Sequence, residues 1–114
     1  MKFAIIQNGR SEMGITIGRY TFEGPYSFSS SLEDKAGVYA ILCDAGEEFR
    51  VIDVGESAIV RTRVETHDRK DCWTRNCSTS PKYAAHYTPG MQQQGRMRIE
   101  QEIRDAYDPP CGKA

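Results

Sequence analysis

Hydrophobic residues occur along the chain in short blocks, separated by glycine, proline and charged positions. Residues 2–6 (KFAII) and 15–23 (ITIGRYTFE) are rich in β-branched and aromatic side chains, which favours strands on either side of a turn-like segment. Residues 37–43 (GVYAILC) form a continuous apolar run that is typical of a buried strand, and residues 49–56 (FRVIDVGE) alternate as a second one. The short turn between these two runs predicts an antiparallel hairpin.

The pattern changes to a helical period after the hairpin. Ser57 is a typical N-cap residue, and apolar positions in the segment that follows, residues 58–68, recur at helical spacing. Arg63 and His67 are four residues apart, so their side chains would lie one above the other on this helix. The sequence therefore predicts a helix that carries a cation and an imidazole on one face.

The rest of the chain predicts a loop, a strand and a second helix. Residues 69–82 are polar and are expected to form a loop with at most one helical turn. Residues 83–88 (YAAHYT) favour a strand, and residues 93–107 favour a helix that ends before Pro109-Pro110. The order β-β-β-β-α-β-α predicts the α+β class, with a small antiparallel β-sheet flanked by helices.

Composition and charge restrict the function only slightly. The chain has 114 residues and no apolar run approaching the roughly 18 residues of a membrane helix, so we expect one domain that does not span a membrane. Its first residues contain too few consecutive apolar positions for a secretory segment, which predicts a cytoplasmic location. The net charge is −1, yet Lys and Arg outnumber Asp and Glu by nine to six over residues 59–105. Such a basic half fits either a polyanion or a solvated surface.

The chain has four cysteines, which are Cys43, Cys72, Cys77 and Cys111. Disulfides are rare in a reducing cytosol, so unpaired and mostly buried thiols are expected. The alternative is a zinc site in which Cys72 and Cys77 join His67 and His86. The spacing disfavours zinc, because four residues separate the two cysteines and the two histidines are not paired at a zinc-finger interval.

The predicted hairpin carries a short motif on each strand. Gly37-Val38-Tyr39 opens the first strand, and Asp53-Val54-Gly55 lies near the end of the second. Arg63 follows Gly55 by eight residues, His67 comes four residues later, and Glu100 lies in the predicted final helix. In this order and at these spacings, the residues resemble the GIY-YIG nuclease superfamily, which includes homing endonucleases, restriction enzymes and the incision subunit of bacterial nucleotide excision repair.

The resemblance covers residues 37–112, about two-thirds of the chain, and implies a GIY-YIG-like domain there. Residues 1–36 lie outside it. We expect this N-terminal extension to add β-strands that pack on the same domain and protect a sheet edge.

The resemblance implies a divalent-metal-dependent endonuclease that hydrolyses DNA phosphodiester bonds. It implies that Glu100 binds Mg²⁺ or Mn²⁺, hard cations that prefer oxygen ligands. Arg63 would stabilise charge on the phosphate with its planar guanidinium, and Arg61 would offer a second phosphate contact. Tyr39 would orient the attacking water or accept its proton, and His67 would relay that proton.

Two positions depart from the pattern of the family. Asp53 replaces the second tyrosine, and Gly112 replaces the asparagine-like ending. A carboxylate at position 53 would either act in catalysis as a second metal ligand or repel phosphate and weaken the reaction. The alternative function is therefore a GIY-YIG-like module that binds nucleic acid or protein without cleaving. Trp73, close to this site in sequence, would stack on an unpaired base or pack in the core.

DNA is the expected partner. A chain of this size with no appended DNA-reading module is poorly equipped for sequence-specific recognition. We therefore expect structure-selective or weakly specific cleavage, a homodimer, or a protein partner that supplies targeting.

Overall fold

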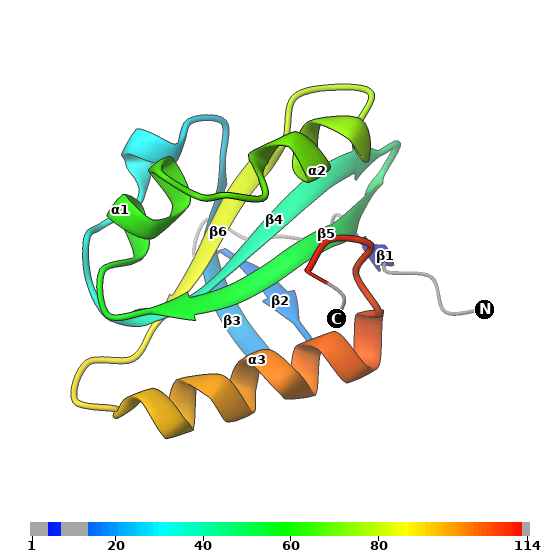
Figure 1. Ribbon diagram of the computed structural model, residues 1–114. Helices are drawn as coiled ribbons and strands as arrows, with labels where there is room; N and C mark the ends of the chain where they lie inside the picture. The colour runs from blue at the N-terminus through cyan, green and yellow to red at the C-terminus, as the bar shows by residue number, and fades with distance from the viewer. Residues whose placement is uncertain (1–4, 8–13, 113–114) are drawn as a thin grey trace.

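A six-stranded antiparallel β-sheet forms the centre of the structure, a computed structural model that describes residues 5–7 and 14–112 (Figure 1). The order of strands across the sheet is β1-β5-β4-β6-β3-β2. The strands are β1 (Ile5–Gln7), β2 (Ile15–Ile17), β3 (Tyr20–Tyr26), β4 (Gly37–Ala45), β5 (Glu48–Ser57) and β6 (Lys82–Tyr87). With helices on both faces of this sheet, the α+β class predicted from the sequence is confirmed.

The helices lie on opposite faces of the sheet. The short helices α1 (Val60–Glu65) and α2 (Lys70–Arg75) cover one face, and the long helix α3 (Gln93–Tyr107) covers the other (Figure 1). A single 3-10 turn, η1 (Ser29–Ser31), contacts α1. Among the residues that the structure describes, no helix is long and apolar enough to cross a membrane.

Two hydrophobic cores result from this arrangement. Along β4, Val38, Ala40 and Leu42 pack in the core that includes α3, whereas Tyr39 and Ile41 pack in the core that includes α1 and α2. Because side chains alternate between the faces of a strand, a strand covered on both faces has to be apolar at every position. This explains the continuous apolar run that the sequence has here.

The hairpin predicted from the sequence is formed by β4 and β5 and contains one irregularity. Ile41 pairs with Asp53, but Leu42 pairs with Val51, so the bulge adds one residue, Ile52, to β5. Such a bulge moves every later residue of the strand to the other face of the sheet. It therefore brings Asp53 to the face that α1 and α2 cover.

The N-terminal strands extend the sheet at both edges. β1 pairs with residues 48–50 of β5, while β3 pairs with β6 and β2 pairs with β3. The segment 15–23, predicted as one strand, contains β2 and the start of β3, because the chain turns at Gly18, which has a φ of 63°. Most of the turn predicted over residues 7–14 lies outside the described residues.

The start of α1 differs from the prediction. Ser57 does not cap the helix, since Ile59 is the N-cap residue and the Ser57 hydroxyl accepts a hydrogen bond from the Ile59 N–H at 3.0 Å. The cap comes instead from Asp34, which accepts hydrogen bonds from the Thr62 N–H at 2.9 Å and from its hydroxyl at 2.8 Å. A residue 28 positions away thus replaces the local cap expected from the sequence.

The end of α1 also differs. The sequence predicted that Arg63 and His67 share a helix. The helix stops at Glu65 instead, so His67 lies beyond its end. The segment 69–82, expected to be mostly loop, contains α2. The strand β6 and the helix α3 are confirmed, and α3 ends at Tyr107 because Asp108 adopts a left-handed conformation with a φ of 50° ahead of Pro109.

Both cysteine pairs form disulfides, which contradicts the expectation of free thiols. Cys43 is bonded to Cys77, and Cys72 is bonded to Cys111. The partners are 34 and 39 residues apart, so no local spacing indicated which cysteines the fold would bring together.

The second disulfide fastens the C-terminal tail, residues 108–112, across the sheet edge. Beyond residue 51, the outer side of β5 has no strand partner in the described chain. The Cys111 N–H donates to the Ile52 carbonyl there at 3.0 Å, and Arg104 of α3 donates to the Cys111 carbonyl at 3.0 Å. The tail therefore runs from the α3 face to the α2 face and covers part of the open edge.

Candidate active site

Tyr39 lies on β4 directly opposite Gly55 on β5. Its side chain is 1% exposed, and a Cβ added at Gly55 would overlap the phenol oxygen and ring. Only glycine leaves room for a ring to lie across the neighbouring backbone in this way. Tyr39 and Gly55 thus form one structural unit, and the bulge in β5 puts them opposite each other, because without it Val54 would face Tyr39.

The phenol oxygen of Tyr39 is hydrogen-bonded to Nε2 of His67 at 2.7 Å. On the other side of the imidazole, Nδ1 accepts the backbone N–H of Arg69 at 3.0 Å. A neutral imidazole has one donor and one acceptor nitrogen, so the proton of His67 sits on Nε2 and points at the Tyr39 oxygen. Tyr39 therefore accepts from His67, and its own proton is free to point elsewhere. This arrangement is one that stabilises a phenolate.

Burial keeps both groups neutral near pH 7. It raises the pKa of Tyr39 to about 12, although Arg63 and Arg69 pull that pKa down. Burial lowers the pKa of His67 from its ordinary 6.5 to about 4, and the same two arginines act in the same direction. Ionisation of Tyr39 at neutral pH would therefore require a further positive charge close to its oxygen.

Two more of the predicted residues lie within electrostatic reach of Tyr39. Arg63, half-buried on α1, lowers the pKa of the Tyr39 phenol, and Glu100, on α3, raises it. The Arg63 guanidinium also lies 3.4 Å from a carboxylate oxygen of Asp68. Of the predicted site residues, Tyr39 and His67 are therefore in direct contact, whereas Arg63 and Glu100 act on Tyr39 only through their charge. Arg61 is exposed on α1, and no direct contact joins it to this group among the described residues.

Glu100 has the chemistry expected of a ligand for a divalent cation. Its side chain is 25% exposed and accepts one hydrogen bond, from Nε of Arg104 to Oε2 at 3.2 Å, which leaves Oε1 without a partner in the described chain. Within those residues, no group of three or more His, Cys, Asp or Glu side chains could hold a metal ion. Mg²⁺ does not require such a group, because it is often held by one carboxylate together with water and phosphate oxygens. Glu100 therefore fits the predicted metal.

Asp53 is fully buried, and protein groups surround its carboxylate. Oδ2 accepts from Trp73 Nε1 at 2.7 Å and from Arg69 Nε at 2.9 Å. Oδ1 accepts from the Val54 N–H and from Arg104 Nη2, each at 2.8 Å. Both oxygens are thus occupied, which leaves little room for the metal or substrate contact that we expected from the sequence. A buried carboxylate is tolerated where charged donors surround it in this way.

The Asp53 network also supports the imidazole of His67. Trp73 is buried, which is one of the two placements expected for it. The centroid of its ring lies 4.8 Å from that of the His67 ring. Arg69 binds Asp53 through its side chain and His67 through its backbone. Asp53 is therefore linked to Tyr39 through two residues that contact His67. The sequence contained one signal for this network, an acidic residue in a buried strand, which demands basic partners.

The alternative zinc site is not assembled. Cys72 and Cys77 belong to different disulfides, and His67 is hydrogen-bonded to Tyr39. His86 lies on the opposite face of the sheet, where its Nδ1 is 2.9 Å from the Thr21 carbonyl oxygen and its ring packs against Phe22. The four predicted zinc ligands therefore have other partners.

Comparisons of this chain with protein-family models, with curated proteins and with solved structures found no match.

Proposed function

We propose that the protein is a divalent-metal-dependent endonuclease that hydrolyses DNA phosphodiester bonds with a GIY-YIG-type site. One observation above all supports the proposal: Tyr39 crosses Gly55 of the second motif while accepting a hydrogen bond from His67. The tyrosine and the glycine come from the two motifs that suggested the family. Their contact explains why the two motifs occur together on neighbouring strands. The charges of Arg63 and Glu100, two further candidates, also act on the phenol of Tyr39.

In the proposed reaction, Tyr39 first loses its own proton to solvent, and the resulting phenolate orients the attacking water and accepts its proton. The hydrogen bond from His67 holds the phenol oxygen in position and stabilises the charge that develops there. Arg63 donates hydrogen bonds from its planar guanidinium to the phosphate, where negative charge increases in the transition state. Mg²⁺ or Mn²⁺ bound at Glu100 would supply a Lewis acid for the phosphate and would lower the pKa of nearby groups.

Asp53 has a positioning role in this proposal. It binds Arg69 and Trp73, and both of these residues contact His67. The site therefore tolerates the loss of the second motif tyrosine, because the carboxylate supports the imidazole from behind instead of facing the substrate.

A binding module without cleavage is the second candidate. The observation that favours it is the high pKa of Tyr39, which keeps the phenol neutral unless a cation approaches. A DNA partner and targeting by a second copy or a protein partner remain proposals under either function. The cytoplasmic location is also a prediction, and the two disulfides favour an oxidising compartment over it.

The test is nicking of supercoiled plasmid and of branched DNA in Mg²⁺ or Mn²⁺. We expect Tyr39→Phe, Arg63→Gln and Glu100→Gln each to lower the rate by at least about 10²-fold, the usual cost of a lost transition-state contact. Glu102→Gln is the matched control, because Glu102 is on the same helix but pairs with the exposed Arg19. Metal-dependent nicking that only the first three variants lose would support the nuclease. DNA binding without cleavage in both metals would favour the binding module.

A further inference from the structure

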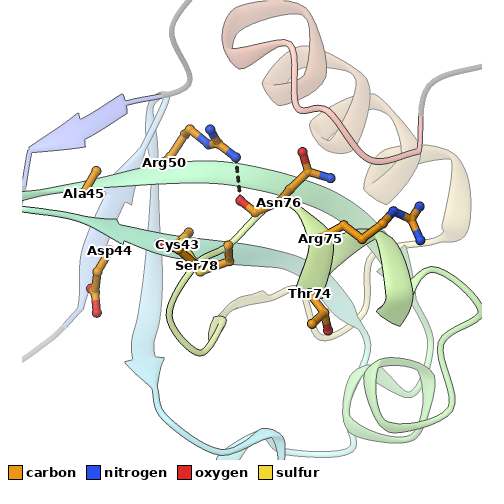
Figure 2. A pocket seen from close by; sticks show the side chains of 9 residues that line it. Cys43, Asp44, Ala45, Arg50, Thr74, Arg75, Asn76 and Ser78 are labelled. Carbon is orange, nitrogen blue, oxygen red and sulfur yellow. Dashed lines mark hydrogen bonds between the residues drawn. A yellow bond between two sulfur atoms is a disulfide. The ribbon is translucent and has the colours of Figure 1, made fainter.

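A polar cavity of about 480 Å³ lies between the end of the β4–β5 hairpin and the end of α2 (Figure 2). Cys43 lines it from β4, and Arg50, its cross-strand partner, lines it from β5. Cys43 belongs to the same core as Tyr39, so the cavity is on the sheet face of the candidate active site. Tyr39 and Cys43 are four positions apart along β4, a distance of about 13 Å. The volume lies within the range of ligand sites.

Two arginines in this cavity have no acidic partner. In the described chain, five arginines form salt bridges with carboxylates, namely Arg19, Arg63, Arg69, Arg96 and Arg104. Arg50 instead donates to the Asn76 carbonyl at 2.6 Å, and its buried Nε has no hydrogen-bond partner. Arg75, the last residue of α2, is exposed and has no salt bridge among these residues. Neither arginine of the cavity is therefore paired with a carboxylate in a salt bridge among these residues.

The two guanidinium groups do not converge. Figure 2 shows the Arg50 guanidinium on one side of Asn76 and the Arg75 guanidinium extending away on the other side. Asp44, the one acidic residue among the described residues that line the cavity, points away from Arg50. A single phosphate would be held best by a convergent pair of donors. Two separated cations instead match a ligand with several anionic groups, and Ser78 adds a hydroxyl to the lining.

We propose that this cavity binds the phosphate backbone of a DNA strand at a distance from the bond that is cleaved. The proposal rests on the proposed function, since it takes the scissile phosphate to lie beside Tyr39. Arg50 contacts one backbone phosphate at the inner wall, and Arg75 contacts another at the rim. Contacts of this kind give affinity and register without reading the sequence of the strand.

The test measures binding of a fluorescently labelled single-stranded oligonucleotide of twelve nucleotides, in EDTA so that no cleavage occurs. We compare the full chain with Arg50→Gln, Arg75→Gln and Arg98→Gln. Arg98 is an exposed arginine of α3 on the opposite face, and its replacement changes the net charge by the same amount. We expect the first two variants to weaken binding about 3- to 10-fold and to reduce the slope of log K against log salt by about 0.7 each. Arg98→Gln should change affinity less than about 2-fold.

Arg75→Gln keeps the test decisive if Arg50→Gln fails to fold, because Arg75 is exposed and no side-chain hydrogen bond or salt bridge holds it in the described chain. Equal losses in all three variants would overturn the proposal, since they would reflect net charge alone. The proposal would also fail if inorganic phosphate bound in the cavity while oligonucleotide affinity did not depend on Arg75.

Cleavage assays on the same variants separate this proposal from the proposed function. Weaker DNA binding, with cleavage retained at saturating DNA, would support both. Unchanged binding in a protein that cleaves DNA would overturn the cavity proposal alone. Loss of affinity in a protein that never cleaves would support a strand-binding cavity and overturn the nuclease.

Discussion

The ring of Tyr39 covers the backbone of Gly55 on the neighbouring strand, and the two residues face each other in the register of the sheet. The contact places the phenol oxygen within 2.7 Å of His67. It follows that the glycine of the second motif does not serve a turn in this protein. It provides the space that a buried tyrosine occupies.

Replacing Gly55 with alanine should displace the Tyr39 ring, because the added Cβ would overlap the phenol. We expect a loss of about 1–3 kcal/mol in the free energy of unfolding, the usual cost of overpacking a core. Urea denaturation measures it. Gly95→Ala is the control: its Cβ would meet the flexible side chain of Met91, and alanine favours the helix around it. A Gly55→Ala protein as stable as the wild type would contradict the proposed packing.

Replacing Asp53 with asparagine should be among the most destabilising acid-to-amide changes in the chain. The half-buried guanidinium groups of Arg69 and Arg104 would lose their common buried carboxylate, and breaking a buried pair typically costs about 3–5 kcal/mol. The matched change, Glu102→Gln, breaks an exposed pair with Arg19 and should cost less than about 1 kcal/mol. Thermal and urea unfolding of both variants give the comparison.

The Asp53 variant should also alter the imidazole of His67. Where Asp53→Asn remains folded, NMR of the His67 nitrogens should show a change in the Nε2-protonated tautomer, because Arg69 and Trp73 lose their anchor. An unchanged tautomer would show that Asp53 supports the fold without positioning His67.

Acid should destabilise the protein through His67. The folded-state pKa of about 4 lies below the ordinary value of 6.5, so the unfolded chain binds the proton more readily in this range. The contribution of His67 to the free energy of unfolding is complete above about pH 6.5 and is lost as the pH falls to about 4. It amounts to about 3 kcal/mol. The carboxylate of Asp68, 3.3 Å from Nδ1 of His67, favours the imidazolium and keeps the pKa of His67 from falling further. Urea midpoints between pH 4 and 7 measure the slope, and His67→Gln should flatten it.

Removing the disulfide of the tail by the double change Cys72→Ser and Cys111→Ser should lower stability by about 3–4 kcal/mol, as expected for a closed loop of this length. It should also release the tail from β5. The backbone amide of residue 111, which donates to the Ile52 carbonyl, should then exchange its hydrogen faster. Removal of the Cys43–Cys77 bond should cost a similar amount without affecting that amide. If the amide of residue 111 exchanged at the same rate in both variants, the position of the tail on β5 would not depend on the Cys72–Cys111 disulfide.

Elements defined by local patterns were predicted well from the sequence. The hairpin, β6 and α3 agree with it because their apolar periodicity and their flanking proline and glycine residues act within a few positions. α2 was missed because its six residues, KDCWTR, are mostly polar and bury mainly Trp73.

What the sequence did not indicate depends on contacts between distant segments. Asp34 caps α1 from the segment between η1 and β4, and Arg104 of α3 reaches Asp53 around the edge of β5. The hydrogen bond between Tyr39 and His67 joins two of the predicted site residues, yet the partners of Asp53 were not foreseen. A pattern gives the identity of a buried charge but not the position of the groups that neutralise it.

The two disulfides close loops that overlap, since one joins residues 43 and 77 and the other joins residues 72 and 111. Every peptide bond between Cys43 and Cys111 lies inside at least one of these loops. A single proteolytic cut anywhere in this stretch would therefore leave both fragments covalently attached, and a cut chain would migrate as two pieces only after reduction. Asp53, Arg63, His67 and Glu100 are all within the stretch, so the fragments that carry them would stay covalently joined through a disulfide after such a cut.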